Sequence, residues 1–139
     1  MRWPAPAPGM VIRYSFLWSA EAVQGHEEGI KNRPCAIIIA TSDVETGTRT
    51  HILPITHTPP SNPRDAVEIP QLVKTHLGLD SKRSWIVLNA LNVFVWPGYD
   101  LRPVGRTGSP VYGMLPPTFF LHLRARFVAQ RNPAVTNRT

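Results

Sequence analysis

PCAIIIAT, residues 34–41, is the most apolar of the strand-like segments and predicts a buried β-strand. Proline is tolerated at its first position, because a strand can begin without a ladder hydrogen bond there. Residues 44–48 (VETGT) predict a hairpin turn, since they place polar residues and a glycine between two strand-like segments. Residues 49–56 (RTHILPIT) then return as a second strand, so an antiparallel hairpin forms the centre of the predicted sheet.

Pro54 lies inside this second strand and has no N–H to give to a neighbouring strand. Its position predicts either an edge of the sheet or a β-bulge. A bulge would re-aim Thr56 and His57, which follow it closely in the sequence.

Short elements flank the hairpin on both sides. Strands are predicted at residues 10–18, 66–69, 84–88 and 92–96, with helices at residues 70–78 and 117–130. Residues 1–8 are expected to form an extended arm, residues 102–113 a connector and residues 131–139 a flexible tail. Fifteen prolines in 139 residues fit many short elements within a single domain, residues 1–139. We expect a mainly β, α+β fold: a small, twisted, mostly antiparallel barrel with a short helix and a C-terminal helix.

The composition limits the classes of function. Lysine and arginine number 15 against 9 aspartates and glutamates, a net charge of +6, which favours an acidic partner such as RNA, DNA or an acidic protein. The single cysteine, Cys35, excludes an internal disulfide and fits a reducing cytoplasm. No Cys/His cluster has metal-ligand spacing, and the longest apolar stretch, residues 85–96, is too short to span a bilayer. We expect a cytoplasmic protein with no metal or cofactor and no membrane partner.

Two loops carry the chemistry. Residues 25–33 (GHEEGIKNR) place a histidine, two glutamates, a lysine and an arginine before the buried strand: His26, Glu27, Glu28, Lys31 and Arg33. Residues 53–60 (LPITHTPP) end the other strand with hydroxyls and an imidazole, from Thr56, His57 and Thr58. Ionisable loops at the rim of a sheet are a common way to build a catalytic or nucleic-acid site.

These motifs resemble the MazF/PemK family, the toxins of type II toxin–antitoxin modules. PGMV at residues 8–11 resembles the family's PGDV opening, and GHEEG followed by Arg33 and Pro34 resembles its G-x-E-x-x-G-x-R-P loop. LPIT at residues 53–56 resembles its strand ending in Ile-Thr, and residues 85–96 its paired later strands. Residues 13–18 and 96–103 look like the PemK-like growth-inhibitor branch.

The resemblance implies a fold, an activity and partners. The implied fold is an SH3-like barrel of the PemK/CcdB type that forms a homodimer. The implied activity is sequence-specific, metal-independent endoribonuclease cleavage of single-stranded RNA through a 2′,3′-cyclic phosphate. The implied partners are the RNA substrate and an acidic antitoxin, with operator DNA bound only through the antitoxin complex.

Metal-free RNA cleavage needs a base for the 2′-hydroxyl proton, a cation for the phosphorane charge and an acid for the leaving 5′-oxygen. The resemblance assigns the cation to Arg33 and a further hydrogen-bond donor to Thr56. The base matches Glu27 when counted from Gly25, or Glu28 when counted back from Arg33, because this loop is one residue longer.

The two loop histidines, His26 and His57, are candidates for the acid or the base. Residues expected to contact RNA are His26, Lys31, Thr58, Arg64 and Trp18.

Two other functions stay open from the sequence. One is a toxin of the same barrel that acts without catalysis on a protein target such as DNA gyrase. The other is a nucleic-acid-binding relative whose active site has decayed, which the extra loop residue allows. The combination of Glu27, Arg33 and Thr56 favours the enzyme, because a protein-binding toxin would not need it.

Overall fold

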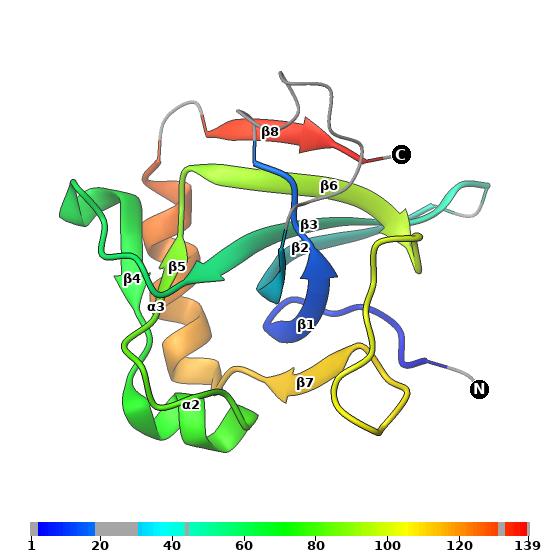
Figure 1. Ribbon diagram of the computed structural model, residues 1–139. Helices are drawn as coiled ribbons and strands as arrows, with labels where there is room; N and C mark the ends of the chain where they lie inside the picture. The colour runs from blue at the N-terminus through cyan, green and yellow to red at the C-terminus, as the bar shows by residue number, and fades with distance from the viewer. Residues whose placement is uncertain (1–2, 19–30, 44, 131–132, 139) are drawn as a thin grey trace.

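The computed structural model describes residues 3–18, 31–43, 45–130 and 133–138 (Figure 1). These residues form eight strands, two α-helices and one 3-10 turn. The strands are β1 (Met10–Ser15), β2 (Asn32–Asp43), β3 (Gly47–Thr56), β4 (Ala66–Glu68), β5 (Trp85–Val87), β6 (Ala90–Trp96), β7 (Val111–Met114) and β8 (Ala134–Asn137). The helical elements are η1 (Pro63–Asp65), α2 (Gln71–Leu77) and α3 (Pro117–Val128). The mainly β, α+β class expected from the sequence is confirmed.

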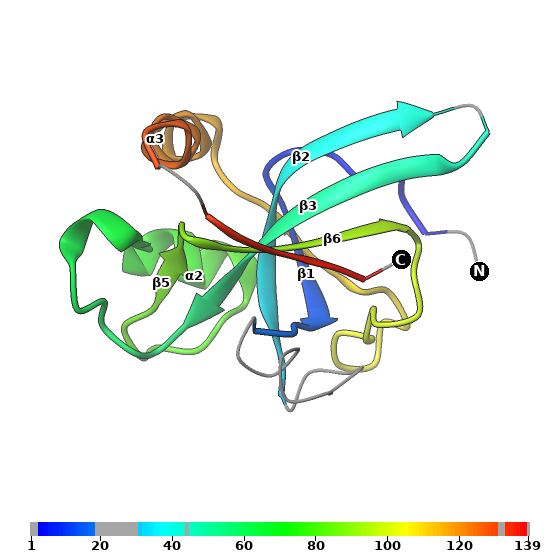
Figure 2. The ribbon, with the colours of Figure 1, turned by 90° about the horizontal axis from the view of Figure 1, so that it is seen from above.

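The strands form one sheet built around the predicted hairpin. Its order is β4-β5-β3-β2-β1-β7, while β6 pairs with β3 and β8 pairs with β6. The β6–β8 pair is parallel and the other pairs are antiparallel. Figure 2 shows β2 and β3 as a long hairpin that extends from the body of the protein, with α3 on the opposite side.

The apolar run at residues 34–41 is explained by burial on both faces of β2. Ala36 and Ile38 pack into a core cluster with Leu123 of α3, whereas Cys35 and Ile37 pack into a second cluster with residues such as Phe94 of β6. Successive side chains of a strand point to opposite faces, so a strand covered on both sides has no polar alternation. The side chains of β1 and β3 alternate in the same way, so each of these strands contributes residues to both clusters.

Pro54 is at neither a sheet edge nor a bulge, so that prediction is wrong. It pairs with Cys35 in the β2–β3 ladder, and the register shift of this pair lies between Ile37 and Ile39. On its other side β3 pairs with β6 up to Ile52 and with β5 from Ile55 onward. Pro54 therefore lies where β3 exchanges one neighbour for another and a missing N–H is tolerated.

The C-terminal segment is not the flexible tail that the sequence predicts, at least over residues 134–138. β8 pairs with β6, and the Arg138 side chain is only 3% exposed. Its guanidinium contacts the Asp100 carboxylate at 2.8 Å and donates to the Ser15 carbonyl and the Asn92 side-chain oxygen, each at 2.8 Å. These partners lie far away in the sequence, so the local pattern gives no sign of them.

Two further boundaries differ from prediction. The connector expected at residues 102–113 contains the start of β7, and the strand expected at residues 10–18 ends at Ser15. Residues 3–7 form neither helix nor strand, and Trp3 packs against the second core cluster. No helix in the described part of the chain is both long enough and apolar enough to cross a membrane.

Candidate active site

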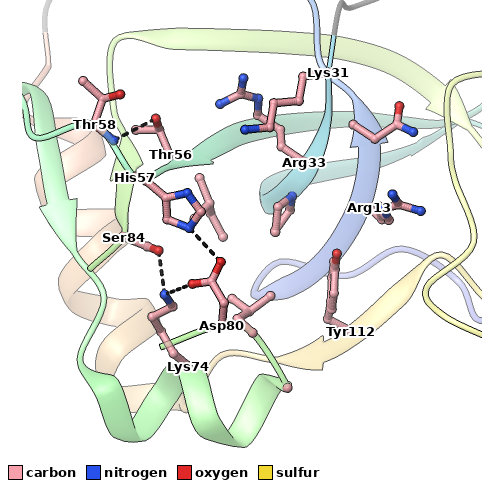
Figure 3. Close-up of a pocket in the computed structure, with 15 residues that line it drawn as sticks. Arg13, Lys31, Arg33, Thr56, His57, Thr58, Lys74, Asp80, Ser84 and Tyr112 are labelled. Atoms are coloured by element: carbon pink, nitrogen blue, oxygen red, sulfur yellow. Dashed lines mark hydrogen bonds and ion pairs between the residues drawn. The ribbon is translucent and has the colours of Figure 1, made fainter. Parts of the chain in front are cut away.

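A pocket of about 420 Å³ lies where the start of β2 meets the end of β3 (Figure 3). Its charged lining consists of four cationic side chains, Arg13, Lys31, Arg33 and Lys74, and one carboxylate, Asp80. The remaining lining residues are Asn32, Pro34, Ile55, Thr56, His57, Thr58, Gly78, Leu79, Ser84 and Tyr112. The excess of positive charge suits an anionic ligand.

The antiparallel hairpin brings the two predicted loops together. Cys35 pairs with Pro54 in the antiparallel ladder. Arg33 lies two residues before Cys35 and Thr56 two residues after Pro54, so both reach the same pocket from neighbouring strands. Figure 3 shows Lys31 and Arg33 on one side of the pocket, with Thr56 and His57 facing them from the other. Residues more than 20 positions apart thus form one site because of strand register.

Arg33 offers an unsatisfied hydrogen-bond donor. Its Nε atom is buried and has no hydrogen-bond partner among the described residues. Its guanidinium carbon lies 5.3 Å from the centre of the Trp18 ring, a cation–π distance. A buried donor without an acceptor costs about 1–3 kcal/mol, so among the described residues the Arg33 Nε group is energetically unfavourable.

The side chain of Thr56 is fixed by one hydrogen bond that leaves its hydroxyl proton free to be donated. The Thr58 N–H donates to Thr56 Oγ1 at 3.1 Å, which fixes the side chain at the point where β3 ends. Because the oxygen accepts in this bond, the hydroxyl can still donate to a second group. Thr56 can therefore give a hydrogen bond to an anion in the pocket.

Lys74 is almost completely buried, with 1% of its side chain exposed. Its ammonium group donates to Asp80 Oδ1 at 2.7 Å, to Ser84 Oγ at 2.7 Å and to the carbonyl of Lys82. Three acceptors match the three hydrogens of an ammonium group, which satisfies its hydrogen-bonding capacity in the interior.

Gly78 makes this arrangement possible by ending α2 in the left-handed region. Its φ is 72°, and a Cβ placed there would meet nothing within 4 Å, so the requirement for glycine comes from the backbone conformation. The chain then turns back, and Asp80 comes to lie against Lys74. The helix predicted at residues 70–78 is confirmed, with Pro70 and Gly78 as the residues that flank it.

Asp80 links Lys74 to His57. The Asp80 Oδ2 atom lies 2.8 Å from Nε2 of His57, and the two side chains are 50% and 45% exposed. The hydrogen bond from Lys74, assisted by the charges of His57 and Lys74, lowers the pKa of the Asp80 carboxyl. An ionised carboxylate only accepts hydrogen bonds, so Nε2 carries the proton and Nδ1 of a neutral ring is left as an acceptor.

Tyr112 lies on the opposite side of the pocket from His57 (Figure 3). Burial raises the pKa of its phenol, which therefore stays protonated and able to donate. Arg13 donates to the Pro103 carbonyl at 2.9 Å, so part of its guanidinium is committed to the neighbouring loop.

The structure places the predicted site residues in three groups. Lys31, Arg33, Thr56, His57 and Thr58 all line the pocket, while Trp18 packs on Arg33 at its border. Arg64 does not line this pocket but lies in a separate depression with Asn62 and Gln130, and its expected contact with RNA stays a prediction. His26, Glu27 and Glu28 lie outside the described residues.

Sequence reasoning missed Lys74, Asp80, Ser84 and Tyr112. Lys74 sits beside Val73 and three residues before Leu77, on the apolar face of α2, which is an unusual place for a lysine. That position is the only local sign of a special role for Lys74, because the partners of Lys74 depend on the turn at Gly78.

Within the described ranges, no cluster of three or more histidine, cysteine, aspartate or glutamate side chains is placed to hold a metal ion. No family model matches the chain, and no curated protein matches it significantly.

Proposed function

We propose that this protein is a metal-independent endoribonuclease that cleaves single-stranded RNA. We further propose that it is the toxin of a type II toxin–antitoxin pair, with a MazF/PemK-like SH3 barrel, and that it acts in the cytoplasm as a homodimer. The loop and strand-end motifs support the family assignment, and the geometry of the pocket supports the chemistry.

One observation carries the proposal: Arg33, Thr56 and His57 meet in a single cationic pocket. Arg33 contributes a permanent charge with an unpartnered donor, and Thr56 contributes a hydroxyl donor. A phosphate oxygen is the acceptor that a guanidinium fork binds best. His57, oriented by Asp80, brings a group able to take or give a proton next to that phosphate position.

The proposed reaction is an in-line transesterification. The 2′-oxygen of a ribose attacks the adjacent phosphorus, the bond from phosphorus to the 5′-oxygen breaks, and a 2′,3′-cyclic phosphate and a 5′-hydroxyl are formed. The 2′-hydroxyl proton passes to the base, for which Nδ1 of His57 is available alongside Glu27 or Glu28. Arg33 and Thr56 stabilise the negative charge on the phosphorane oxygens, and an acid protonates the leaving oxygen.

The pocket also suits inhibition by an acidic antitoxin. An antitoxin segment that places a carboxylate between Lys31 and Arg33 would occupy the position proposed for the phosphate. Such a segment would block RNA by competing for the same charges.

The proposal is tested by the cleavage rate of Arg33 variants in EDTA. Arg33→Ala is expected to lower the rate roughly 10²–10⁴-fold, because it removes the charge that faces the phosphorane. Arg33→Lys keeps the charge but loses the fork, so it should recover only part of the rate. Arg106→Ala is the matched control, since Arg106 is exposed and does not line the pocket.

Equal cleavage by wild type and Arg33→Ala would contradict the proposal. Intact RNA with the wild-type protein, with or without added magnesium, would favour a toxin that acts on a protein target.

A further inference from the structure

A second pocket of about 360 Å³ adjoins the first, and the two share Thr56 and Thr58. It is lined by Trp18, Thr56, Thr58, Pro59, Pro60, Ser61, Asp65, Ala66, Val87 and Asn89. Ala66 pairs with Val87 in the β4–β5 ladder, which places Asp65 and Asn89 at the same end of that pair. The pocket is therefore built on paired strands beside the proposed phosphate position.

The walls of this second pocket are suited to an aromatic ring. They combine the indole of Trp18 with Pro59, Pro60, Ala66 and Val87. The same indole lies against the Arg33 guanidinium, so it borders both pockets. Single-stranded RNA is commonly recognised by stacking an unpaired base on such side chains.

Asp65 lines the second pocket and also the neighbouring depression beside Asn62 and Gln130, and its carboxylate has no partner among the described residues. Its backbone is fully used, because its N–H donates to the Asn62 carbonyl at 2.9 Å and its carbonyl accepts from Leu88 at 2.7 Å. The half-buried carboxylate makes no hydrogen bond or ion pair with any residue that the structure describes. The backbone hydrogen bonds of Asp65 fix the position of its carboxylate beside an apolar wall. Because an ionised carboxylate only accepts hydrogen bonds, this position favours a ligand that donates them.

We propose that the second pocket binds the guanine base of the RNA nucleotide whose phosphate is held by Arg33 and Thr56. This inference rests on the proposed function and names the base that the same site selects. Guanine presents two adjacent donors, N1–H and the N2 amine, which match the two oxygens of the Asp65 carboxylate. Next to these donors, its O6 atom is an acceptor for the amide of Asn89.

The other bases do not match this arrangement. Adenine and cytosine place a ring nitrogen with a lone pair next to their amine, which would face a carboxylate oxygen. Uracil presents one N–H between two carbonyl oxygens. With adenine, cytosine or uracil, at least one carboxylate oxygen would have no hydrogen-bond donor or would face another lone pair. The resulting loss of binding energy is the source of the selectivity for guanine.

The test measures binding instead of cleavage. The probes are the four nucleoside 3′,5′-bisphosphates, which carry one base between two phosphates, and binding is followed by calorimetry. The guanosine compound is expected to bind about ten-fold or more tightly than the other three. The inosine compound lacks the N2 amine and should lose most of this advantage.

Asp65→Asn should remove the guanine preference while leaving the weaker affinity for the other three compounds unchanged. Glu45→Gln is the matched control, because it removes a carboxylate on the exposed turn between β2 and β3. Equal affinity for all four bisphosphates, or a guanine preference that survives Asp65→Asn, would overturn the inference. So would a failure of all four to bind.

These outcomes are separable from those of the proposed function. Guanine-selective binding by a protein that cleaves no RNA would keep this inference and overturn the ribonuclease. Cleavage in EDTA without base preference in this pocket would do the reverse.

Discussion

A lysine that is 1% exposed is stable only where its charge is paired and its hydrogens are all donated. Lys74 meets both conditions through Asp80, Ser84 and the Lys82 carbonyl. The result is a buried support for Asp80, which in turn fixes His57 at the mouth of the pocket. We infer that Lys74 is a positioning residue, because it acts on the pocket through Asp80.

Lys74→Met is expected to lower the free energy of unfolding by about 2 kcal/mol, since hydrogen bonds to a charged group are lost and their acceptors remain. Lys82→Met is the matched control, because that side chain is exposed. Urea unfolding of the three proteins measures the difference.

The difference between wild type and Lys74→Met should depend on pH. Lys74 lowers the pKa of Asp80 in the folded protein, so this stabilisation is fully present above the ordinary aspartate pKa of about 3.9. It should be lost as the pH falls through the lower pKa of the folded state. A difference that stays constant from neutral pH into strong acid would contradict the link between Lys74 and Asp80.

His57 and Asp80 are expected to act as a unit in catalysis. His57→Gln should lower single-turnover cleavage roughly 10²–10⁴-fold, because the group that takes or gives the proton is lost. Asp80→Asn should have a smaller effect, and the double variant should be no slower than His57→Gln alone. His122→Gln, on the exposed side of α3, is the control. Additive losses in the double variant would show that Asp80 does not work through His57.

Among the secondary-structure elements, β8 extends the sheet beside β6 and carries Arg138 into the interior. Arg138 and Asn92 share a hydrogen bond, and Asn92 also exchanges two hydrogen bonds with the backbone of Leu17. Trp18 follows directly and packs on Arg33. The C-terminal strand therefore supports the segment that borders both pockets.

Arg138→Met is expected to destabilise the protein by roughly 3 kcal/mol, because it leaves the largely buried Asp100 carboxylate without its ion pair. Adding Asp100→Asn should recover part of that loss, since the uncompensated charge is then removed. Thermal or urea unfolding of the single and double variants gives the comparison. An Arg138→Met protein within about 0.5 kcal/mol of wild type would argue against this role for β8.

Elements with strong local patterns could be predicted from the sequence, and elements that depend on distant partners could not. The hairpin of β2 and β3 was predictable because a strand buried on both faces is continuously apolar. β8 is a short, mostly exposed strand that is followed directly by Arg138 with its distant partners, and β7 contains Gly113.

The same contrast holds within the site. The strand-end motifs predicted that Arg33, Thr56 and His57 belong to the site, and all three line the pocket. Lys74 and Asp80 meet only because of the turn at Gly78, and nothing local predicts that contact.

For the whole molecule, the net charge of +6 and the cationic pocket predict salt-sensitive binding of RNA. The logarithm of the binding constant for a fully 2′-O-methylated, uncleavable RNA should fall linearly with the logarithm of salt concentration. Arg33→Ala and Lys31→Ala should each reduce the slope by roughly 0.7, the value for one phosphate contact on a single strand. Fluorescence anisotropy measures the slopes, and an unchanged slope in both variants would place the bound phosphates elsewhere on the protein.

The metal-free phosphoryl-transfer site that we propose where the start of β2 meets the end of β3 would leave a characteristic chemistry at the ends of the RNA fragments. The purified protein is incubated with mixed-sequence, single-stranded RNA in EDTA, and both new ends are mapped. We predict cuts at a short motif that leave 2′,3′-cyclic phosphate and 5′-hydroxyl ends. RNA that stays intact in EDTA, or fragments with 5′-phosphate ends that form only with added magnesium, would contradict the claim.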